Sequence, residues 1–235
     1  AILDAPEHYG TPGRANLASE SNLGPTYEGF THQPVLPRSG QSVTVTVQAE
    51  DFHEVASMTL WYRANSTSWR SVSMNDSGDG IYSGTIPGQS SNTVVQFYVE
   101  GTDKLGATST FPAAGAGSRA WYKVDDGKAS DGPHHNFRII MTPADTEWLH
   151  ETTNVMSNDP MKATVVYDEQ EVFYGTTLRL KGSQRGRDKT IRVGFLVKFD
   201  PAQPFRGVHE TMAVDRSGAG DQFSQKEILV KHGIH

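Results

Sequence analysis

The stretch Val43-Thr44-Val45-Thr46-Val47 alternates apolar and polar side chains. Successive side chains of a β-strand point to opposite faces of a sheet, so this pattern predicts a strand with one buried side and one solvent-facing side. Further short strands are expected at 58–62, 69–74, 81–86, 94–102 and 120–124. About seven strands at this spacing, without helical periodicity, predict a β-sandwich of immunoglobulin or fibronectin type over residues 40–125.

The segments on either side of this sandwich are expected to be linkers. Residues 1–39 contain turn signals such as Gly10-Thr11-Pro12-Gly13 and lack apolar periodicity, so they are expected to form a linker and the end of a preceding module. Residues 126–136 contain a second Gly- and Pro-bearing stretch and are expected to form another linker. Residues 137–235 are expected to form an α+β domain, of which this chain contains only the first part.

The third part is expected to begin with a strand at 137–141 and to continue into a helix. Thr142 can cap this helix, Pro143 fits its first position, and Asp145 favours its positive end. The helix is therefore expected to run to about Glu151. Further strands are expected at 161–167, 172–181, 191–199 and 212–215.

The last stretch, 222–235, is interpreted as a helix. Phe223, Glu227 and Val230 recur at a spacing that places them on one side of a helix, and Ile234 continues the series. No helix C-cap is recognisable at the end of this stretch. We therefore expect the chain to stop inside a domain.

The composition excludes several classes of protein. The chain has 235 residues and a formal net charge of −6, which does not indicate a nucleic-acid-binding protein. It has no cysteine, which excludes disulfide bonds, thiolate metal sites and a cysteine nucleophile. No apolar run approaches the roughly 18 residues that cross a bilayer, so no transmembrane segment is expected. The Gly-x-Ser-x-Gly and His-Glu-x-x-His motifs of hydrolases are absent.

A basic turn is predicted between the strands at 172–181 and 191–199. The stretch 179–189 is rich in Lys and Arg, although the chain as a whole is acidic. Gly182 and Ser183 are small residues that allow backbone N–H groups to approach phosphate oxygens. The turn therefore indicates a site for an anion, and an ordinary hairpin with a solvated basic rim is the alternative.

Five short pieces of the third part carry a resemblance to a known family. They are 162–167 (KATVVY), 178–183 (LRLKGS), 194–199 (GFLVKF), 205–209 (FRGVH) and 226–232 (KEILVKH). In their order and spacing they resemble the first half of a domain of the CotH family, bacterial spore-coat and secreted proteins with an atypical protein-kinase-like fold. The stretch 10–16 also resembles the end of a lamin-tail-like domain. The resemblance implies a bacterial protein that is secreted or held at the cell surface.

The resemblance implies a nucleotide site on the basic turn. Gly182 and Ser183 match the family's phosphate-facing turn, and Lys181 stands in place of its Arg. Arg185 lies in the same turn and is included in the expected site. The implied cofactors are ATP and Mg or Mn, and the implied partner is a protein whose Ser or Thr accepts a phosphate.

Two residues outside the turn would complete this nucleotide site. The resemblance places the phosphate-pairing Lys at Lys198, with Lys189 as the alternative, and the Glu that orients it at Glu227. Such a pair would neutralise and position the phosphates, which is the main task in phosphoryl transfer. The competing interpretation is a solvated Lys and a helix-surface Glu. The family's catalytic and metal-holding acids belong to the second half of the domain, so no catalytic residue and no metal ligand is assigned.

A second hypothesis is a non-enzymatic binding or adhesion protein at the cell surface. Trp61, Trp69 or Trp121 of the sandwich would stack on sugars if their rings were exposed, because an aromatic face matches the apolar CH face of a sugar. A polysaccharide would then be the partner. The competing interpretation places these rings in the core.

Two further patterns are interpreted as structural. The turn at 75–80 mimics the first half of a calcium loop, but Ile86 stands where such a loop needs a Glu, so a hairpin turn is expected. His134 and His135 are adjacent and would point to opposite faces of a strand, which makes them poor joint metal ligands.

Overall fold

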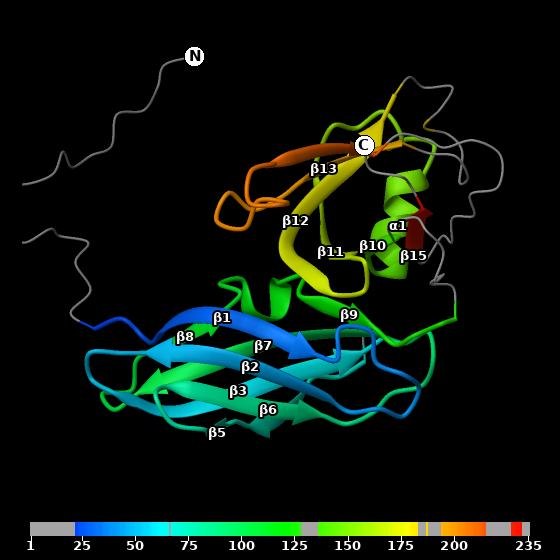
Figure 1. The fold of residues 1–235 in the computed structure, drawn as a ribbon. Coiled ribbons are helices and arrows are strands. Elements are labelled where there is room, and N and C mark those ends of the chain that lie inside the picture. Colours follow the sequence, from blue (N-terminus) through cyan, green and yellow to red (C-terminus); the bar gives the residue numbers. More distant parts are fainter. Residues whose placement is uncertain are drawn as a thin grey trace, which may run out of the picture.

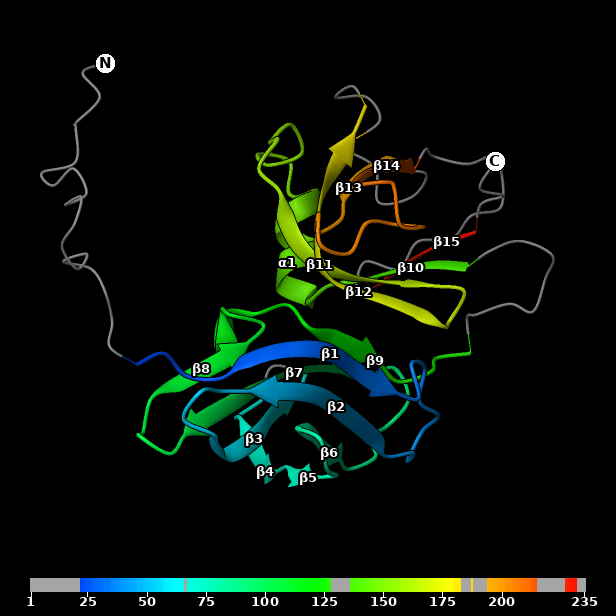
Figure 2. The same cartoon turned by 60° about the vertical axis from the view of Figure 1, so that its left-hand side comes forward.

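The structure is a computed structural model, and it describes residues 22–65, 67–127, 136–182, 187, 194–214 and 227–231. Within these residues the protein is mainly β, with one α-helix and antiparallel strands in three sheets. Two of the sheets form a sandwich, and the third sheet lies with the helix beside it (Figure 1). Figure 2 shows β1 and β9 on the side of the sandwich nearest to the third sheet.

The sandwich contains the predicted strands and three others. Its first sheet has the strand order β1-β2-β6-β5, and its second has the order β4-β3-β7-β8 with β9 also paired to β7. The first sheet consists of β1 (Thr26–Gln33), β2 (Val43–Glu50), β5 (Asn75–Asp76) and β6 (Ile81–Ile86). The second consists of β3 (Val55–Ala64), β4 (Arg70–Ser73), β7 (Val94–Asp103), β8 (Thr108–Phe111) and β9 (Trp121–Lys123), with a 3-10 turn at Gly115–Gly117.

Side-chain alternation along the strands builds the sandwich core. Val43, Val45 and Val47 of β2 are fully buried, as predicted from their period of two. Leu60 of β3 and Phe97 of β7 face them from the second sheet and are fully buried as well. Each such side chain stabilises the fold by about 1.5–3 kcal/mol through removal from water. The core therefore lies between the two sheets, and the alternate side chains of β3 and β7 point away from it.

The third sheet has the order β14-β13-β12-β11-β10-β15. Its strands are β10 (Asn136–Ile140), β11 (Met161–Tyr167), β12 (Glu171–Lys181), β13 (Gly194–Lys198), β14 (Thr211–Val214) and β15 (Glu227–Lys231). The helix α1 (Pro143–His150) follows β10, and the Thr142 hydroxyl accepts a hydrogen bond from the backbone N–H of Asp145 at 3.1 Å. The predicted cap and the predicted start of this helix are confirmed.

The prediction that residues 1–39 form a linker is wrong for the part that contains β1. This strand pairs with β2 in antiparallel register, and its Phe30 and His32 are buried. The register shifts near Gly29, whose φ is 61°, and this shift interrupts the alternation that would have revealed the strand. Residues 1–21 lie outside the described residues. The sandwich therefore begins earlier in the chain than expected.

The helix predicted at 222–235 is wrong where the structure describes this stretch. Residues Glu227–Lys231 form β15, antiparallel to β10, with backbone register partners such as Ile228 and Ile139. A short apolar run does not distinguish helix from strand by periodicity alone. Pairing along the free edge of β10 satisfies the backbone of both strands, and this tertiary contact outweighs the helical pattern.

The sandwich and the third sheet share a buried junction. Trp121 of β9 belongs to the core under the third sheet. Its backbone N–H donates to the Thr164 hydroxyl at 3.1 Å, and this hydroxyl donates to the carbonyl of Arg119 at 2.6 Å. On the other side of the junction, His32 of β1 lies 2.5 Å from the hydroxyl of Tyr174 on β12. The two units are therefore tied by specific polar contacts as well as by apolar packing.

His32 is neutral in this junction. Its Nε2 lies 3.1 Å from the carbonyl oxygen of Val35, which can only accept, so Nε2 carries the proton and Nδ1 accepts from the Tyr174 hydroxyl. Burial lowers the pKa of His32 to about 4 and raises the pKa of Tyr174. Both groups are therefore uncharged at neutral pH.

The second predicted linker, 126–136, contributes to the junction with a buried ion cluster. Lys123 Nζ lies 2.9 Å from an oxygen of Asp126, and the other Asp126 oxygen is 3.7 Å from Arg138 NH1. Arg138, which is fully buried, also reaches Glu169 at 3.3 Å. Asp126 is therefore an anchor rather than a linker residue, because a carboxylate among buried cations must be held in place.

Candidate functional site

The outer face of the second sandwich sheet carries a pair of parallel aromatic rings. Trp61 of β3 and Tyr98 of β7 are directly opposite each other in the register, and neither belongs to the cluster of buried side chains between the two sheets, although Tyr98 is itself largely buried. Their ring centroids are 6.2 Å apart and their planes differ by 11°. Because side chains alternate along each strand, the buried neighbours Leu60 and Phe97 turn these two rings outward.

A third ring, Trp69, joins this pair from the segment before β4. It meets Tyr98 edge-on, with centroids 5.0 Å apart and planes at 79°. Trp61 and Trp69 are partly exposed, and Tyr98 is 8% exposed. Burial and then the Glu100 carboxylate raise the pKa of Tyr98, so its phenol stays neutral. We call Trp61, Trp69 and Tyr98 the aromatic face.

Polar groups flank the aromatic face on one side. Arg63 and Gln96 are the next register pair on the same side of the sheet, and Arg63 Nε donates to Gln96 Oε1 at 2.8 Å. The guanidinium carbon of Arg63 also lies 4.8 Å from the ring centroid of Trp69. This cation–π contact and the hydrogen bond fix the arginine at the edge of the aromatic face.

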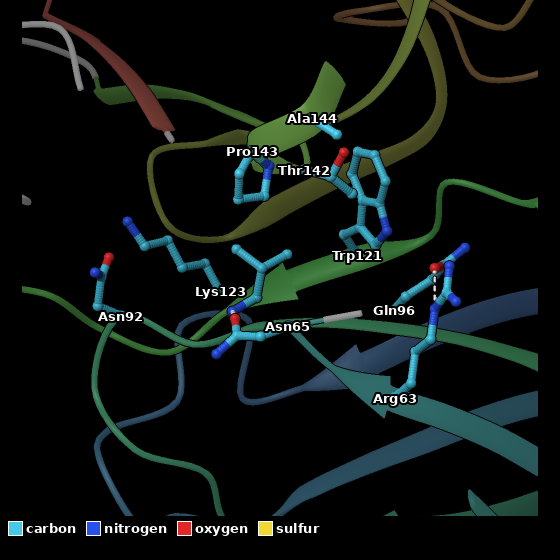
Figure 3. A pocket seen from close by; sticks show the side chains of 10 residues that line it. Arg63, Asn65, Asn92, Gln96, Trp121, Lys123, Thr142, Pro143 and Ala144 are labelled. Atoms are coloured by element: carbon cyan, nitrogen blue, oxygen red, sulfur yellow. Dashed lines mark hydrogen bonds between the residues drawn. The ribbon is translucent and has the colours of Figure 1, made fainter. Parts of the chain in front are cut away.

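A pocket of about 470 Å³ opens where this polar edge meets the start of α1 (Figure 3). Its lining comes from both units of the molecule. The lining residues are Arg63, Asn65, Asn92, Val94, Gln96, Trp121, Lys123, Thr142, Pro143 and Ala144. Side chains with amide and guanidinium groups dominate its sandwich side, so the pocket offers hydrogen bonds beside an apolar aromatic surface.

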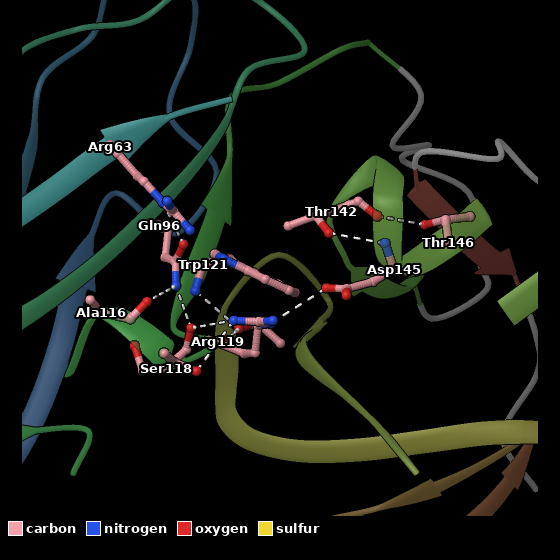
Figure 4. Close-up of polar contacts among 11 residues, drawn as sticks. Arg63, Gln96, Ala116, Ser118, Arg119, Trp121, Thr142, Asp145 and Thr146 are labelled. Atoms are coloured by element: carbon pink, nitrogen blue, oxygen red, sulfur yellow. Dashed lines mark hydrogen bonds and ion pairs between the residues drawn. The ribbon is translucent and has the colours of Figure 1, made fainter. Parts of the chain in front are cut away.

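Trp121 does not fulfil the role that the sequence allowed for it. Its side chain is fully buried, and the guanidinium carbon of Arg119 lies 5.4 Å from its ring centroid. Arg119 is itself held by Asp145 at 3.4 Å (Figure 4). Of the three tryptophans considered as sugar-stacking residues, only Trp61 and Trp69 are exposed at all.

The residues expected on the basic turn are only partly described. Lys181 ends β12 opposite Gly194, and Gly182 follows it with a φ of 105°, a conformation that favours glycine. Ser183, Arg185 and Lys189 lie outside the described residues, as do His134 and His135. The predicted anion site at this turn therefore stays a prediction.

One arginine of the same turn has a structural role. Arg187 is 6% exposed, and its Nε donates to the carbonyl of Gly182 at 2.7 Å. Its NH1 is 3.4 Å from the carbonyl of Val155 and 3.3 Å from that of Ser157. The guanidinium of Arg187 therefore binds backbone carbonyls within the fold. A local excess of Lys and Arg in the sequence does not reveal such a structural role.

Lys198 and Glu227 are not brought together as the family resemblance implies. Lys198 lies on β13, where its register partners are Thr177 of β12 and Thr211 of β14. Glu227 lies on β15 at the far edge of the sheet, where its register partner is Ile140 of β10. Three strands lie between β13 and β15, which corresponds to about 19 Å along the sheet. Glu227 also lies on a strand rather than on a helix. These two residues therefore do not fit a shared nucleotide site in the observed arrangement.

Lys198 has a different basic neighbour. It is exposed, and it lines a shallow cavity of about 450 Å³ together with Arg179 and Thr177. Arg179 is the first residue of the predicted basic stretch and stands on β12, the strand next to that of Lys198. Its NH1 donates to Asn158 Oδ1 at 3.1 Å. The described contacts do not test whether Lys198 binds phosphate, so this role stays a prediction.

One group of Asp and His side chains has the composition of a metal site. Ligand atoms of Asp51, His53 and Asp103 lie within 4.8 Å of one another. Asp103 accepts hydrogen bonds from the backbone N–H groups of Leu105 and Ala107, at 2.9 and 2.8 Å. Asn22 bonds both Asp103, at 2.6 Å, and His53, at 2.9 Å. Internal hydrogen bonds therefore account for this group.

The turn at 75–80 is part of a hairpin, as predicted. Asn75 and Asp76 form β5, which pairs with β6. Asp76 Oδ1 accepts from the backbone N–H of Gly78 at 2.8 Å, the contact of an Asx turn.

No known protein family and no curated protein matches this chain. Among solved structures it is similar to the Br derivative of BhCBM56, with 16% identity over 45% of this chain and 96% of that chain, and a TM-score of 0.29. It is also similar to the uncharacterized protein lmo2446 of Listeria monocytogenes EGD-e, solved with glucose, magnesium and calcium, with 10% identity over 80% of this chain and 15% of that chain (TM-score 0.34). A third is the cycloalternan-forming enzyme of Listeria monocytogenes with a pentasaccharide substrate, with 9% identity over 76% of this chain and 14% of that chain (TM-score 0.32). Similarities this distant assign no function, and the resemblance to the CotH family stays a prediction.

Within the described residues, no helix has the length and apolar character to cross a membrane.

Proposed function

We propose that this chain is a carbohydrate-binding protein and that the aromatic face of the sandwich is its binding surface. The observation that carries the proposal is the outward-facing pair Trp61 and Tyr98, with planes 11° apart on neighbouring strands. The proposal rests on the side chains of this face alone.

An outward aromatic pair needs an explanation because large rings normally stabilise a fold by burial. Trp61 remains partly exposed although its neighbours along β3, Leu60 and Tyr62, belong to the sandwich core, and Trp69 is partly exposed as well. Aromatic rings combine a large apolar face with a polar edge, which suits a ligand that has both CH groups and hydroxyls. Sugars have this combination, because the CH groups of one ring face lie between equatorial hydroxyls.

The surroundings of the aromatic face supply the hydrogen bonds that a sugar requires. Arg63 and Gln96 lie one register pair away, and Asn65 and Asn92 line the adjoining pocket (Figure 3). Amide and guanidinium groups both orient sugar hydroxyls, while the rings provide affinity. The strands of two packed sheets hold these groups, so the surface is formed before the ligand arrives.

Substitution of Trp61, the partly exposed ring of the parallel pair, tests the proposal. The whole chain is titrated calorimetrically with soluble polysaccharides, both neutral and acidic, and Trp61→Ala is compared with the unaltered protein. We expect a loss of affinity of about tenfold or more, because a buried aromatic anchor carries a large share of a binding free energy. Thermal unfolding of the variant monitors its fold.

Phe52 provides a matched control. It is 95% exposed in the turn between β2 and β3, outside the aromatic face. Phe52→Ala removes an exposed ring of similar kind and should leave the affinity unchanged. An equal loss in both variants, or no binding to any polysaccharide of the panel, would contradict the proposed function.

A further inference from the structure

The polar edge of the aromatic face contains a side-chain amide with a fixed orientation. Gln96 is 4% exposed, and its Nε2 donates to the carbonyl of Ser118 and, at 3.3 Å, to that of Ala116. Since both of these partners can only accept, the NH₂ group must face them. The Oε1 atom therefore points the other way, toward Arg63 (Figure 4).

This amide in turn orients the guanidinium of Arg63. The Nε of Arg63 donates to Gln96 Oε1 at 2.8 Å, and one face of the guanidinium lies over Trp69 at 4.8 Å. One edge and one face of the planar group are thus occupied. The end that carries the two terminal nitrogens is the part left for a ligand, and Arg63 lines the pocket.

In the part of the chain that the structure describes, no acidic side chain neutralises the charge of Arg63. Two cations line the pocket, and Lys123 is paired with Asp126 at 2.9 Å. Within the described residues, no carboxylate lies within 4.0 Å of Arg63. The nearest acid on the outer side of β7 is Glu100, which is opposite Thr59 and thus two register pairs beyond Gln96. The aromatic face therefore has a positive end at Arg63.

We infer that the ligand of the aromatic face is an acidic polysaccharide and that Arg63 binds the carboxylate of a uronic acid residue. This inference rests on the proposed function. The register pair Arg63–Gln96 is about 7 Å along the strands from the pair Trp61–Tyr98. A sugar ring stacked on the aromatic face can therefore extend its carboxylate to the guanidinium. The two terminal nitrogens present parallel N–H groups to the two oxygens of a carboxylate, which is the preferred bidentate geometry.

Paired polymers that differ in charge alone test this assignment. The whole chain is titrated with polygalacturonate, alginate and hyaluronan, and with the carboxyl-reduced form of each. We expect at least one acidic polymer to bind about tenfold more tightly than its reduced form, which is the usual contribution of a charge-assisted hydrogen-bonded pair. Added salt should reduce this difference.

The variants then locate the preference. Arg63→Gln should remove the tenfold difference between acid and reduced polymer while the reduced polymer still binds, and Arg63→Lys should keep part of it because the charge remains without the fork. Arg70→Gln, on the exposed Arg70 of the neighbouring β4, should leave the preference unchanged. Thermal unfolding establishes that each variant is folded.

The outcomes separate this inference from the proposed function. Equal binding of acidic and reduced polymers, or a preference that survives Arg63→Gln, overturns the carboxylate assignment and leaves carbohydrate binding intact. A preference for dextran sulfate over dextran, without one for the uronates, also overturns it. Absence of binding to every polymer overturns both.

Discussion

The outer face of the sandwich and the junction beneath the third sheet use arginine in opposite ways. Arg63 is partly exposed, held by Gln96 and Trp69, and has no carboxylate partner among the described residues. Arg138 is fully buried and lies against the carboxylates of Asp126 and Glu169. A cation that is held in place without a carboxylate partner is available to a ligand, whereas a cation paired with carboxylates stabilises the fold.

This difference explains why a basic stretch in a sequence is weak evidence for an anion site. Arg187 belongs to the most basic part of the chain, and its guanidinium binds the backbone carbonyls of Gly182, Val155 and Ser157. Arg63 lies in a strand without any notable excess of charge. Its environment, created by residues distant in the sequence, distinguishes it.

The largest expected effect comes from breaking the buried cluster. Arg138→Ala leaves Asp126 and Glu169 without the cation between them, and removal of one partner from a buried ion cluster typically costs about 3–5 kcal/mol. We expect a large fall in the midpoint of thermal unfolding. Arg63→Ala should change it by far less, because that side chain is partly exposed. Equal losses in the two variants would remove the distinction between a structural and a ligand-binding arginine.

A second effect concerns the junction between the two units and depends on pH. The pKa of His32 is lowered to about 4 by burial, whereas an unfolded histidine titrates near 6.5. Between these values the unfolded state binds more protons, so stability falls as the pH decreases from about 6.5 to about 4. The total loss from this residue is on the order of 3 kcal/mol. Unfolding midpoints measured at pH 7 and pH 4.5 should show this dependence.

His32→Gln is the variant that isolates this contribution. It removes the titrating group, and we expect it to flatten the profile between pH 4.5 and 7 relative to the unaltered chain. Burial also lowers the pKa of His150, so His150→Gln serves as a comparison at a second, partly buried histidine. A profile that His32→Gln leaves unchanged would show that the junction histidine does not carry the pH dependence.

Much of the fold could be predicted because short-range patterns determine it. The alternation at 43–47, the cap Thr142 and the strand Met161–Tyr167 are all visible in the structure as expected. β1 was missed because the register shift near Gly29 breaks its alternation, and β15 because its pairing partner β10 lies far away in the sequence. Local patterns indicate whether a segment prefers helix or strand. Where this preference is ambiguous, pairing with a distant strand decides the structure.

For the candidate site, the sequence predicted the type of residue, tryptophan, but not which tryptophans are exposed or which polar residues lie beside them. Tryptophans were expected to be sugar-stacking residues or core residues, and periodicity distinguishes Trp61 from its buried neighbour Leu60 once the strand is recognised. Arg63 and Gln96 gave no signal, because their importance depends on a hydrogen bond across two strands and on the carbonyl of Ser118. Contacts of this kind arise from the register of the sheet, which sequence patterns alone do not determine.

The smallest expected effect is at Lys198, which tests the comparison with a cation that is exposed but for which no ligand is proposed. This lysine is exposed, so Lys198→Ala should change the free energy of unfolding by at most about 0.5 kcal/mol. Because three strands separate β13 from the strand of Glu227, we also expect any affinity of the chain for ATP, measured by calorimetry, to change less than threefold. A loss of ATP binding on this substitution would show that a second, exposed cation serves a ligand. An exposed cation would then bind a ligand without being held in place by neighbouring side chains. The difference between Arg63 and the structural arginines would then consist only in whether a carboxylate neutralises the charge.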